Sequence, residues 1–212
     1  MTACEAYVAL REACTETVND PFDRHVIACI FAIAAREAAS GGTLCSGLGM
    51  SGPDLRSVIE ETFPTMLSML IPMGLDGDVA CMEDERCVRE LLRRFRSRAG
   101  AVNTLLTTLI ARRAGRPNHL WQDLGLANRG ELSSLMMRHF APLARRNTQD
   151  MKWKKFFYRM ICREDGFSLC VAPTCSECKD FETCFGDESG ESLLARAGLP
   201  RTNKELDQLA AS

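Results

Sequence analysis

The length and composition of this chain are those of an ordinary folded protein, and they exclude several classes. Its 212 residues can build one substantial hydrophobic core without disulfides, with 46% apolar and 25% charged residues. No apolar run approaches the roughly 20 residues of a membrane span, and the first residues lack a secretion-signal pattern. We therefore expect a cytoplasmic protein that neither spans nor binds a membrane.

The net charge of −2 conceals an uneven distribution along the chain. Residues 1–85 carry 4 basic and 14 acidic side chains, residues 86–159 carry 17 and 4, and residues 160–212 carry 5 and 10. A basic middle segment can attract an anion or an acidic partner surface. We favour a simpler interpretation, in which the arginines of 86–98 form the solvated face of a helix that pairs with the acidic N-terminal segment.

The order of apolar residues along the chain predicts an all-α protein. Apolar side chains recur at helical spacing in stripes that begin at Val26, Cys87, Val102 and Trp153, whereas sustained period-two alternation is missing. We expect amphipathic helices over 83–98 and 150–163, with Asp150 near the first turn of the second. The predicted organisation is a helical body over 1–163, an irregular cysteine-rich metal-binding loop over 164–188 and a short helical tail over 189–212.

Two parts of the body align with each other at an offset of 76 residues, which becomes 77 after a one-residue insertion. Both parts predict a helix, a leucine-glycine turn, a second helix and a proline stop. The aligned pairs are Arg36 with Arg112, Ala38 with Ala114, Leu44 with Leu120, Leu48 with Leu124, Gly49 with Gly125, Leu55 with Leu132, Val58 with Leu135, and Phe63 with Phe140. This pattern predicts possible repeats at about 22–98 and 99–163, with chance similarity of amphipathic helices as the alternative.

The cysteine-rich segment carries the strongest chemical signal. Cys170, Cys175, Cys178 and Cys184 are spaced CxxxxCxxCxxxxxC, and Pro173 lies between the first two. Four thiolates on one short segment can face a common centre, and sulfur donors select iron-sulfur clusters, zinc or another soft metal. The other 7 of the 11 cysteines follow no framework, which favours free thiols in a reducing compartment.

The spacing separates the candidate metals only in part. Structural zinc sites usually pair two CxxC motifs or add a histidine pair, and neither is present here. The first three cysteines match the opening of a plant-type ferredoxin loop, but the fourth follows at a short distance instead of a long one. An ordinary four-iron cluster for electron transfer and a zinc-stabilised nucleic-acid-binding module therefore both remain alternatives. No catalytic triad, phosphate loop or dinucleotide fingerprint indicates an enzyme.

The approach to these cysteines resembles a known family. The run 151–158 (MKWKKFFY), then Cys162 and the four cysteines ending in CFG, is similar to the nitrogen-fixation NifQ family. Residues 48–64, 124–126 and 129–140, closing near Asn147, are similar too, so the resemblance spans about 22–188. The cysteine spacing with its aromatic and basic approach is specific, whereas the helical part alone is not.

This resemblance implies a molybdenum carrier that is not an enzyme. Members are thought to hold a cluster of molybdenum, iron and sulfide, and to supply molybdenum for the iron-molybdenum cofactor of nitrogenase. The implied partners are the nitrogenase iron protein and the cofactor-assembly scaffold, with no nucleic acid. On this basis Cys170, Cys175, Cys178 and Cys184 ligate the cluster.

Several other side chains are secondary candidates. Cys162 could be an auxiliary ligand, although a packed thiol is the simpler interpretation. Lys152, Lys154, Lys155 and Arg159 are the positive charges nearest in sequence to the cysteines, so they could offset an anionic cluster or attract molybdate, or be ordinary surface residues. His25 and His139 could contact the cargo, but a capping or surface role is the commoner one. We assign no role to His119.

Overall fold

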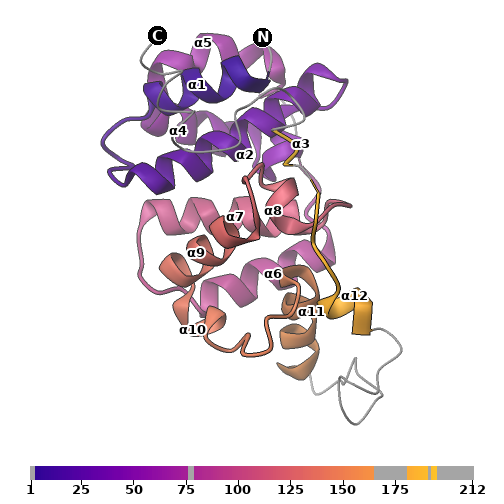
Figure 1. Ribbon diagram of the computed structural model, residues 1–212. Helices are drawn as coiled ribbons and strands as arrows, with labels where there is room; N and C mark the ends of the chain where they lie inside the picture. The colour runs from indigo at the N-terminus through magenta and orange to yellow at the C-terminus, as the bar shows by residue number, and fades with distance from the viewer. Residues whose placement is uncertain (1–2, 76–78, 165–180, 191, 195–212) are drawn as a thin grey trace.

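The protein is described by a computed structural model, which covers residues 3–75, 79–164, 181–190 and 192–194. Every element in these ranges is helical, which confirms the all-α prediction. The helices stack in the order α1 (Ala3–Ala13), α2 (Pro21–Ala39), α7 (Ala101–Ala114), α6 (Glu83–Arg94) and α11 (Trp153–Glu164), each in contact with the next (Figure 1). The predicted domain boundaries stay predictions.

The remaining helices are short and connect or cover this stack. In the first half they are α3 (Leu44–Leu48), α4 (Gly52–Thr62), η1 (Pro64–Met66), α5 (Leu67–Leu70) and η2 (Ile71–Met73). In the second half they are α8 (Leu120–Asp123), α9 (Arg129–His139), α10 (Ala141–Ala144) and α12 (Phe181–Phe185). None of the described helices is both long and apolar enough to cross a bilayer.

Helix α2 is the centre of the core because it is apolar around its whole circumference. Ten consecutive residues from Val26 to Ala35 are each at most 4% exposed. The helix begins where the Asp20 side chain accepts hydrogen bonds from Phe22 N and Asp23 N, with Pro21 in the first position. Neighbouring helices therefore cover every side of α2, and the core is continuous through both halves of the chain.

The two aligned parts share backbone details as well as helix order. Gly49 ends α3 at φ 71°, and Gly125 follows α8 at φ 75°. Phe63 ends α4 at φ −138° and ψ 53°, and Phe140 ends α9 at φ −136° and ψ 41°. Pro64 is the first residue and Pro142 the second residue of the next short helix in each part, because the missing N–H is harmless in a first turn.

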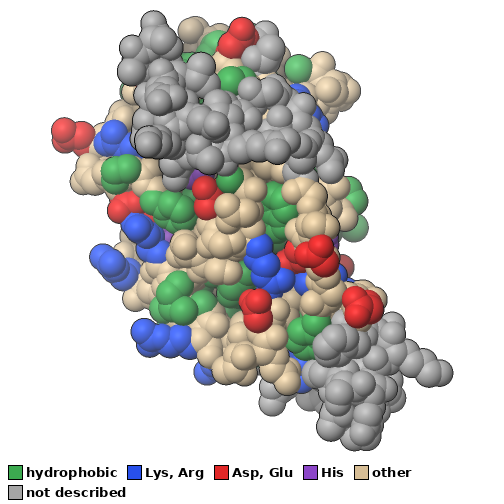
Figure 2. All heavy atoms as spheres, in the orientation of Figure 1, with side chains coloured by type: hydrophobic (Ala, Val, Ile, Leu, Met, Phe, Trp, Pro, Cys, Tyr) green, Lys and Arg blue, Asp and Glu red, His purple; other side chains and the backbone are tan. Residues whose placement is uncertain are grey.

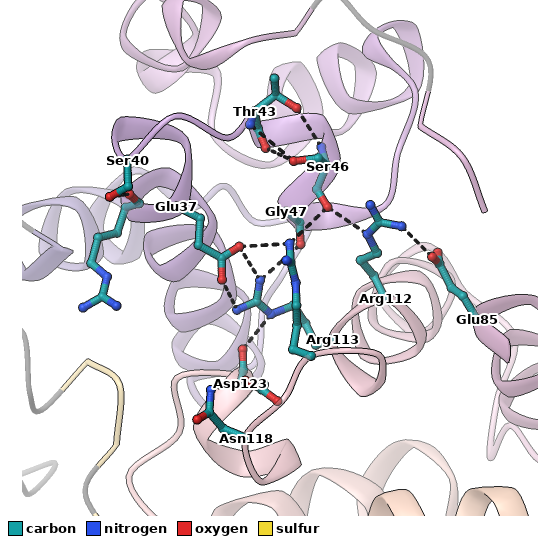
Figure 3. Close-up of polar contacts among 12 residues, drawn as sticks. Glu37, Ser40, Thr43, Ser46, Gly47, Glu85, Arg112, Arg113, Asn118 and Asp123 are labelled. Carbon is teal, nitrogen blue, oxygen red and sulfur yellow. Dashed lines mark hydrogen bonds and ion pairs between the residues drawn. The ribbon is translucent and has the colours of Figure 1, made fainter. Parts of the chain in front are cut away.

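A buried arginine joins the two parts (Figure 3). Arg113 Nη1 and Nη2 lie 2.8 and 2.9 Å from the two carboxylate oxygens of Glu37, which is 76 positions earlier. Arg113 Nε also donates to Asp123 O at 2.7 Å, and Nη1 donates to Gly47 O at 3.4 Å. The Arg113 side chain is fully buried, so this network stabilises the interface only because each donor has an acceptor.

The basic middle does pair with the acidic first half, but largely through arginines other than those expected. Arg113 and Arg116 contact Glu37, and Arg138 contacts Asp20. Helix α6 ends at Arg94, so Arg96 and Arg98 lie outside it. Lysine and arginine side chains remain exposed along the side of the molecule where α9 and α10 lie (Figure 2).

Candidate metal centre

The structure describes only one of the four predicted cysteine ligands. Cys170, Cys175 and Cys178 lie outside the described residues, whereas Cys184 lies in α12. The prediction of an irregular loop is therefore wrong at residues 181–185, which form a short helix. Cys184 is partly buried and packs against the core. Its carbonyl oxygen accepts a hydrogen bond of 2.9 Å from Lys152 N, immediately before α11. The segment that carries the last predicted ligand is therefore attached to the start of α11.

A second contact strengthens this attachment. Lys152 Nζ donates to Glu182 O at 3.0 Å, and the same carbonyl accepts from Gly186 N at 2.9 Å. The positive end of the α11 dipole and the Lys152 ammonium thus both lie beside the backbone of residues 182–184. This environment favours negative charge beside residues 182–184.

Aromatic packing determines the position of α11. Trp153 and Phe157 are buried, and the Trp153 ring centre lies 5.9 Å from that of Phe156 in an edge-to-face arrangement. Such a pair adds about 1 kcal/mol to the burial of its apolar area. Helix α11 begins at Trp153, later than predicted, because Asp150 adopts a left-handed φ of 52° and contacts Arg129. The aromatic residues of the approach are therefore structural: they hold the helix from which the chain continues to the cysteines.

The basic residues of the approach have different roles. Lys154 Nζ contacts Asp123 Oδ2 at 2.6 Å, and the two side chains are 18% and 1% exposed. Burial lowers the Lys154 pKa, although the Asp123 carboxylate opposes the shift. Lys155 is exposed. Lys154 thus belongs to the interior, and Lys152 is the lysine that contacts the segment of Cys184.

The chain after α12 contacts the helical body through several side chains. The Glu188 side chain is only 7% exposed and contacts Arg129, and its Oε1 lies 3.1 Å from His119 Nδ1. Ser192 Oγ donates to Gly125 O at 3.3 Å, and Leu194 is buried. The sequence does not reveal this contact of His119. Gln122 three positions later is typical of a helix start, but no sequence pattern indicates Glu188 as a partner.

Gly125 lies under this returning segment. A Cβ atom there would lie 3.0 Å from Ile33 Cγ1, 3.0 Å from Leu194 Cδ1 and 3.1 Å from Cys29 O. Its positive φ also favours glycine. The leucine-glycine turn therefore allows the first half, the second half and the chain beyond Cys184 to approach one another closely.

The remaining cysteines and histidines form no further metal site in the described part of the chain. None of its eight cysteines is in a disulfide, and no three His, Cys, Asp or Glu side chains there are grouped to hold a metal ion. Cys162 is partly buried on α11. His25 Nδ1 lies 2.8 Å from Tyr7 Oη, and His139 Nε2 lies 2.8 Å from Asp23 Oδ1. Both histidines thus have partners in the helical body.

The fold and the site define a class: an all-helical protein in which the last cysteine of a four-cysteine motif lies on a short helix attached to the body. The sequence profile of the NifQ family, described as NifQ, matches residues 26–186, which include all four cysteines. This chain belongs to the NifQ family, and membership implies a role in nitrogen fixation.

Individual relatives agree with this assignment. The protein NifQ homolog of Sinorhizobium fredii is 40% identical over 172 residues, covering 81% of this chain and 75% of that one. The protein NifQ of Rhodobacter capsulatus is 38% identical over 163 residues, covering 75% and 87%. That of Azotobacter vinelandii is 48% identical over 71 residues, covering 34% and 36%. No solved structure matches the chain.

Proposed function

We propose that this protein carries a molybdenum-containing iron-sulfur cluster as cargo and supplies molybdenum for the iron-molybdenum cofactor of nitrogenase. The observation that carries the proposal is the family match over residues 26–186, since it includes the complete four-cysteine motif. Cys170, Cys175, Cys178 and Cys184 would supply thiolates to iron, and the sulfides of the cluster would bind molybdenum. No step requires an acid or base from the protein, so the proposal is a carrier and not an enzyme.

The geometry around α11 supports delivery as well as binding. The 12 residues of α11 span about 18 Å, and the chain leaves its C-terminal end while Cys184 is attached beside its N-terminal end. The two ends of the intervening segment are thus set by one rigid helix. Cys184 is partly buried against the core, and main-chain contacts and one lysine attach its segment to the start of α11. A partner could therefore reach the cargo without unfolding the body.

We propose a cytoplasmic protein that exchanges cargo with the nitrogenase iron protein and the cofactor-assembly scaffold. The body would be a duplicated helix-turn-helix unit whose equivalent residues meet at the interface, as Glu37 and Arg113 do. In that arrangement the duplication provides a stiff support for α11.

Elemental analysis of anaerobically isolated protein from molybdate-fed cells tests the function. We expect iron and molybdenum together, and we expect Cys184→Ala to lose most of both. The matched control is Cys81→Ala, because Cys81 is exposed and outside the motif. Iron without molybdenum would favour the electron carrier, whereas one zinc in a colourless protein would favour the zinc module. Unchanged metal in Cys184→Ala would remove that residue from the ligand set.

A further inference from the structure

A cavity of about 630 Å³ lies between the loop over residues 145–151 and helix α11. Its volume is within the range of small-molecule sites. Three arginines line it, Arg145, Arg146 and Arg159, together with the apolar side chains of Met151, Phe156 and Met160. No carboxylate is among the described residues that line it. The cavity is therefore positively charged around an apolar floor.

The loop that forms one wall is held in a defined conformation. Asn147 Oδ1 accepts from Met151 N at 2.9 Å, and Asn147 Nδ2 donates to Met151 O at 2.8 Å. Arg129 Nη2 donates to the carbonyl oxygens of Asp150 at 2.7 Å and of Met151 at 3.1 Å. The left-handed backbone at Asp150 is thus supported from two sides. The shape of this wall does not depend on a ligand.

Neither arginine of the same loop is neutralised, and Arg146 is held by an aromatic ring. The Arg146 guanidinium carbon lies 4.3 Å from the Phe95 ring centre, a stacked arrangement that leaves the N–H edge available. Both arginines are exposed, and within the described part of the chain neither has a carboxylate within ion-pair distance. Arginine forks at fixed positions bind anionic oxygens strongly because each N–H···O⁻ bond is charge-assisted.

We propose that this cavity binds a small divalent anion whose charge lies on oxygen atoms. The anion would be an inorganic oxyanion or an organic dicarboxylate, since guanidinium groups recognise both in the same way. A tetrahedral oxyanion is smaller than the cavity and would bind together with water. In neutral water molybdenum is itself such an anion, molybdate. If molybdate is the ligand, the inference rests on the proposed carrier function and places the entry of its metal next to α11.

Calorimetric titration of the metal-free full chain at low ionic strength tests the proposal with molybdate, sulfate and succinate as probes. The variant Arg145→Gln/Arg146→Gln removes two charges from the cavity. Its control is Arg93→Gln/Arg96→Gln, which removes two charges from exposed residues outside the lining. We expect the cavity variant to bind at least about tenfold more weakly and the control to change by less than about twofold. Arg145→Lys/Arg146→Lys keeps the charge without the fork and should be intermediate.

The relative affinities of the three probes identify the class of anion that binds. Tighter binding of molybdate and sulfate than of succinate would assign an inorganic oxyanion, and the reverse would assign a carboxylate. Thiolates can bind to the molybdenum of molybdate but not to sulfate. If the cavity variant loses the same affinity for both anions, binding through cysteines is excluded. No binding of any probe, or equal weakening in both arginine variants, would overturn the proposal. Elemental analysis of the isolated protein is a separate measurement. The protein can therefore lack anion binding and still contain molybdenum and iron, or bind anions and contain neither metal.

Discussion

Glu37 and Arg113 occupy equivalent positions in the two aligned parts of the chain and form a two-point ion pair with each other. Each partner comes from the long first helix of its part, α2 or α7. A single residue from one part thus pairs with the residue at the aligned position in the other part. The same arginine also donates to the carbonyls of Gly47 and Asp123, which are again 76 positions apart.

Replacing Glu37 tests how much this pair stabilises the fold. We expect Glu37→Gln to lower the free energy of unfolding by about 2–3 kcal/mol, because Arg113 would stay buried without a counter-charge. The partial exposure of Glu37 keeps the loss at the lower end of the range for buried pairs. Urea unfolding followed by circular dichroism measures it. The matched control is Glu83→Gln, whose partner Arg86 is exposed, and its midpoint should not move.

Substitution of Gly125 tests how closely the two aligned parts approach the chain beyond Cys184. We expect Gly125→Ala to destabilise the protein by about 2–4 kcal/mol, from the left-handed backbone together with the contacts its Cβ would make. Gly41→Ala is the comparison, because Gly41 has φ 102° but nothing within 4 Å of an added Cβ. The excess loss of Gly125→Ala over Gly41→Ala in thermal unfolding measures the packing part alone. Equal losses would mean that the contacts relax.

Two neighbouring lysines should separate stability from metal binding. Lys154→Met leaves Asp123 buried without its partner, so we expect a loss of about 2–4 kcal/mol in unfolding free energy. Lys152→Met should leave stability nearly unchanged but lower the iron and molybdenum content, because it removes a positive charge beside residues 182–184. Chemical denaturation and elemental analysis of both variants are required. Full metal content in Lys152→Met would contradict the assigned role of this ammonium.

The lowered pKa of the Glu131 carboxyl should make the stability of the fold depend on pH. Burial of its carboxyl raises the pKa, but hydrogen bonds from the His25 ring and from Ala127 N outweigh burial and leave the pKa below its ordinary value of 4.5. The folded state therefore binds the proton more weakly than the unfolded state. The carboxylate contributes stability at pH above about 4.5 that is lost as the pH falls through its lower folded pKa. Glu131→Gln should be less stable at pH 7 and should lose less stability between about pH 5 and pH 3.

The measurement is a series of urea unfolding curves of both proteins across this range. Asp20 titrates in the same region: burial of its carboxyl raises the pKa, but hydrogen bonds from Arg138 and two backbone amides lower it below the ordinary value overall. The comparison must therefore be a difference between variant and wild type. Parallel curves at all pH values would show that Glu131 does not titrate differently on folding.

Local pattern alone determined much of this protein. Apolar spacing predicted helices at Val26, Cys87, Val102 and Trp153, and the positive φ of Gly49 and Gly125 follows their place after a leucine at a helix end. The spacing of the four cysteines and the run before them indicated the family. These signals are readable because each depends on neighbours a few residues apart, within one turn of helix or one short segment.

Only the tertiary structure decided which charged side chains have partners. Arg113 lies in the last turn of α7, where no sequence pattern predicts burial, yet its side chain is fully buried. Lys154 is largely buried beside Asp123, whereas Lys152 contacts the segment of Cys184. The sequence did not predict the contact of His119 with Glu188, nor the arginine-lined cavity beside α11. Such pairs join residues many positions apart, and whether a charge is buried depends on how helices pack and not on its sequence neighbours.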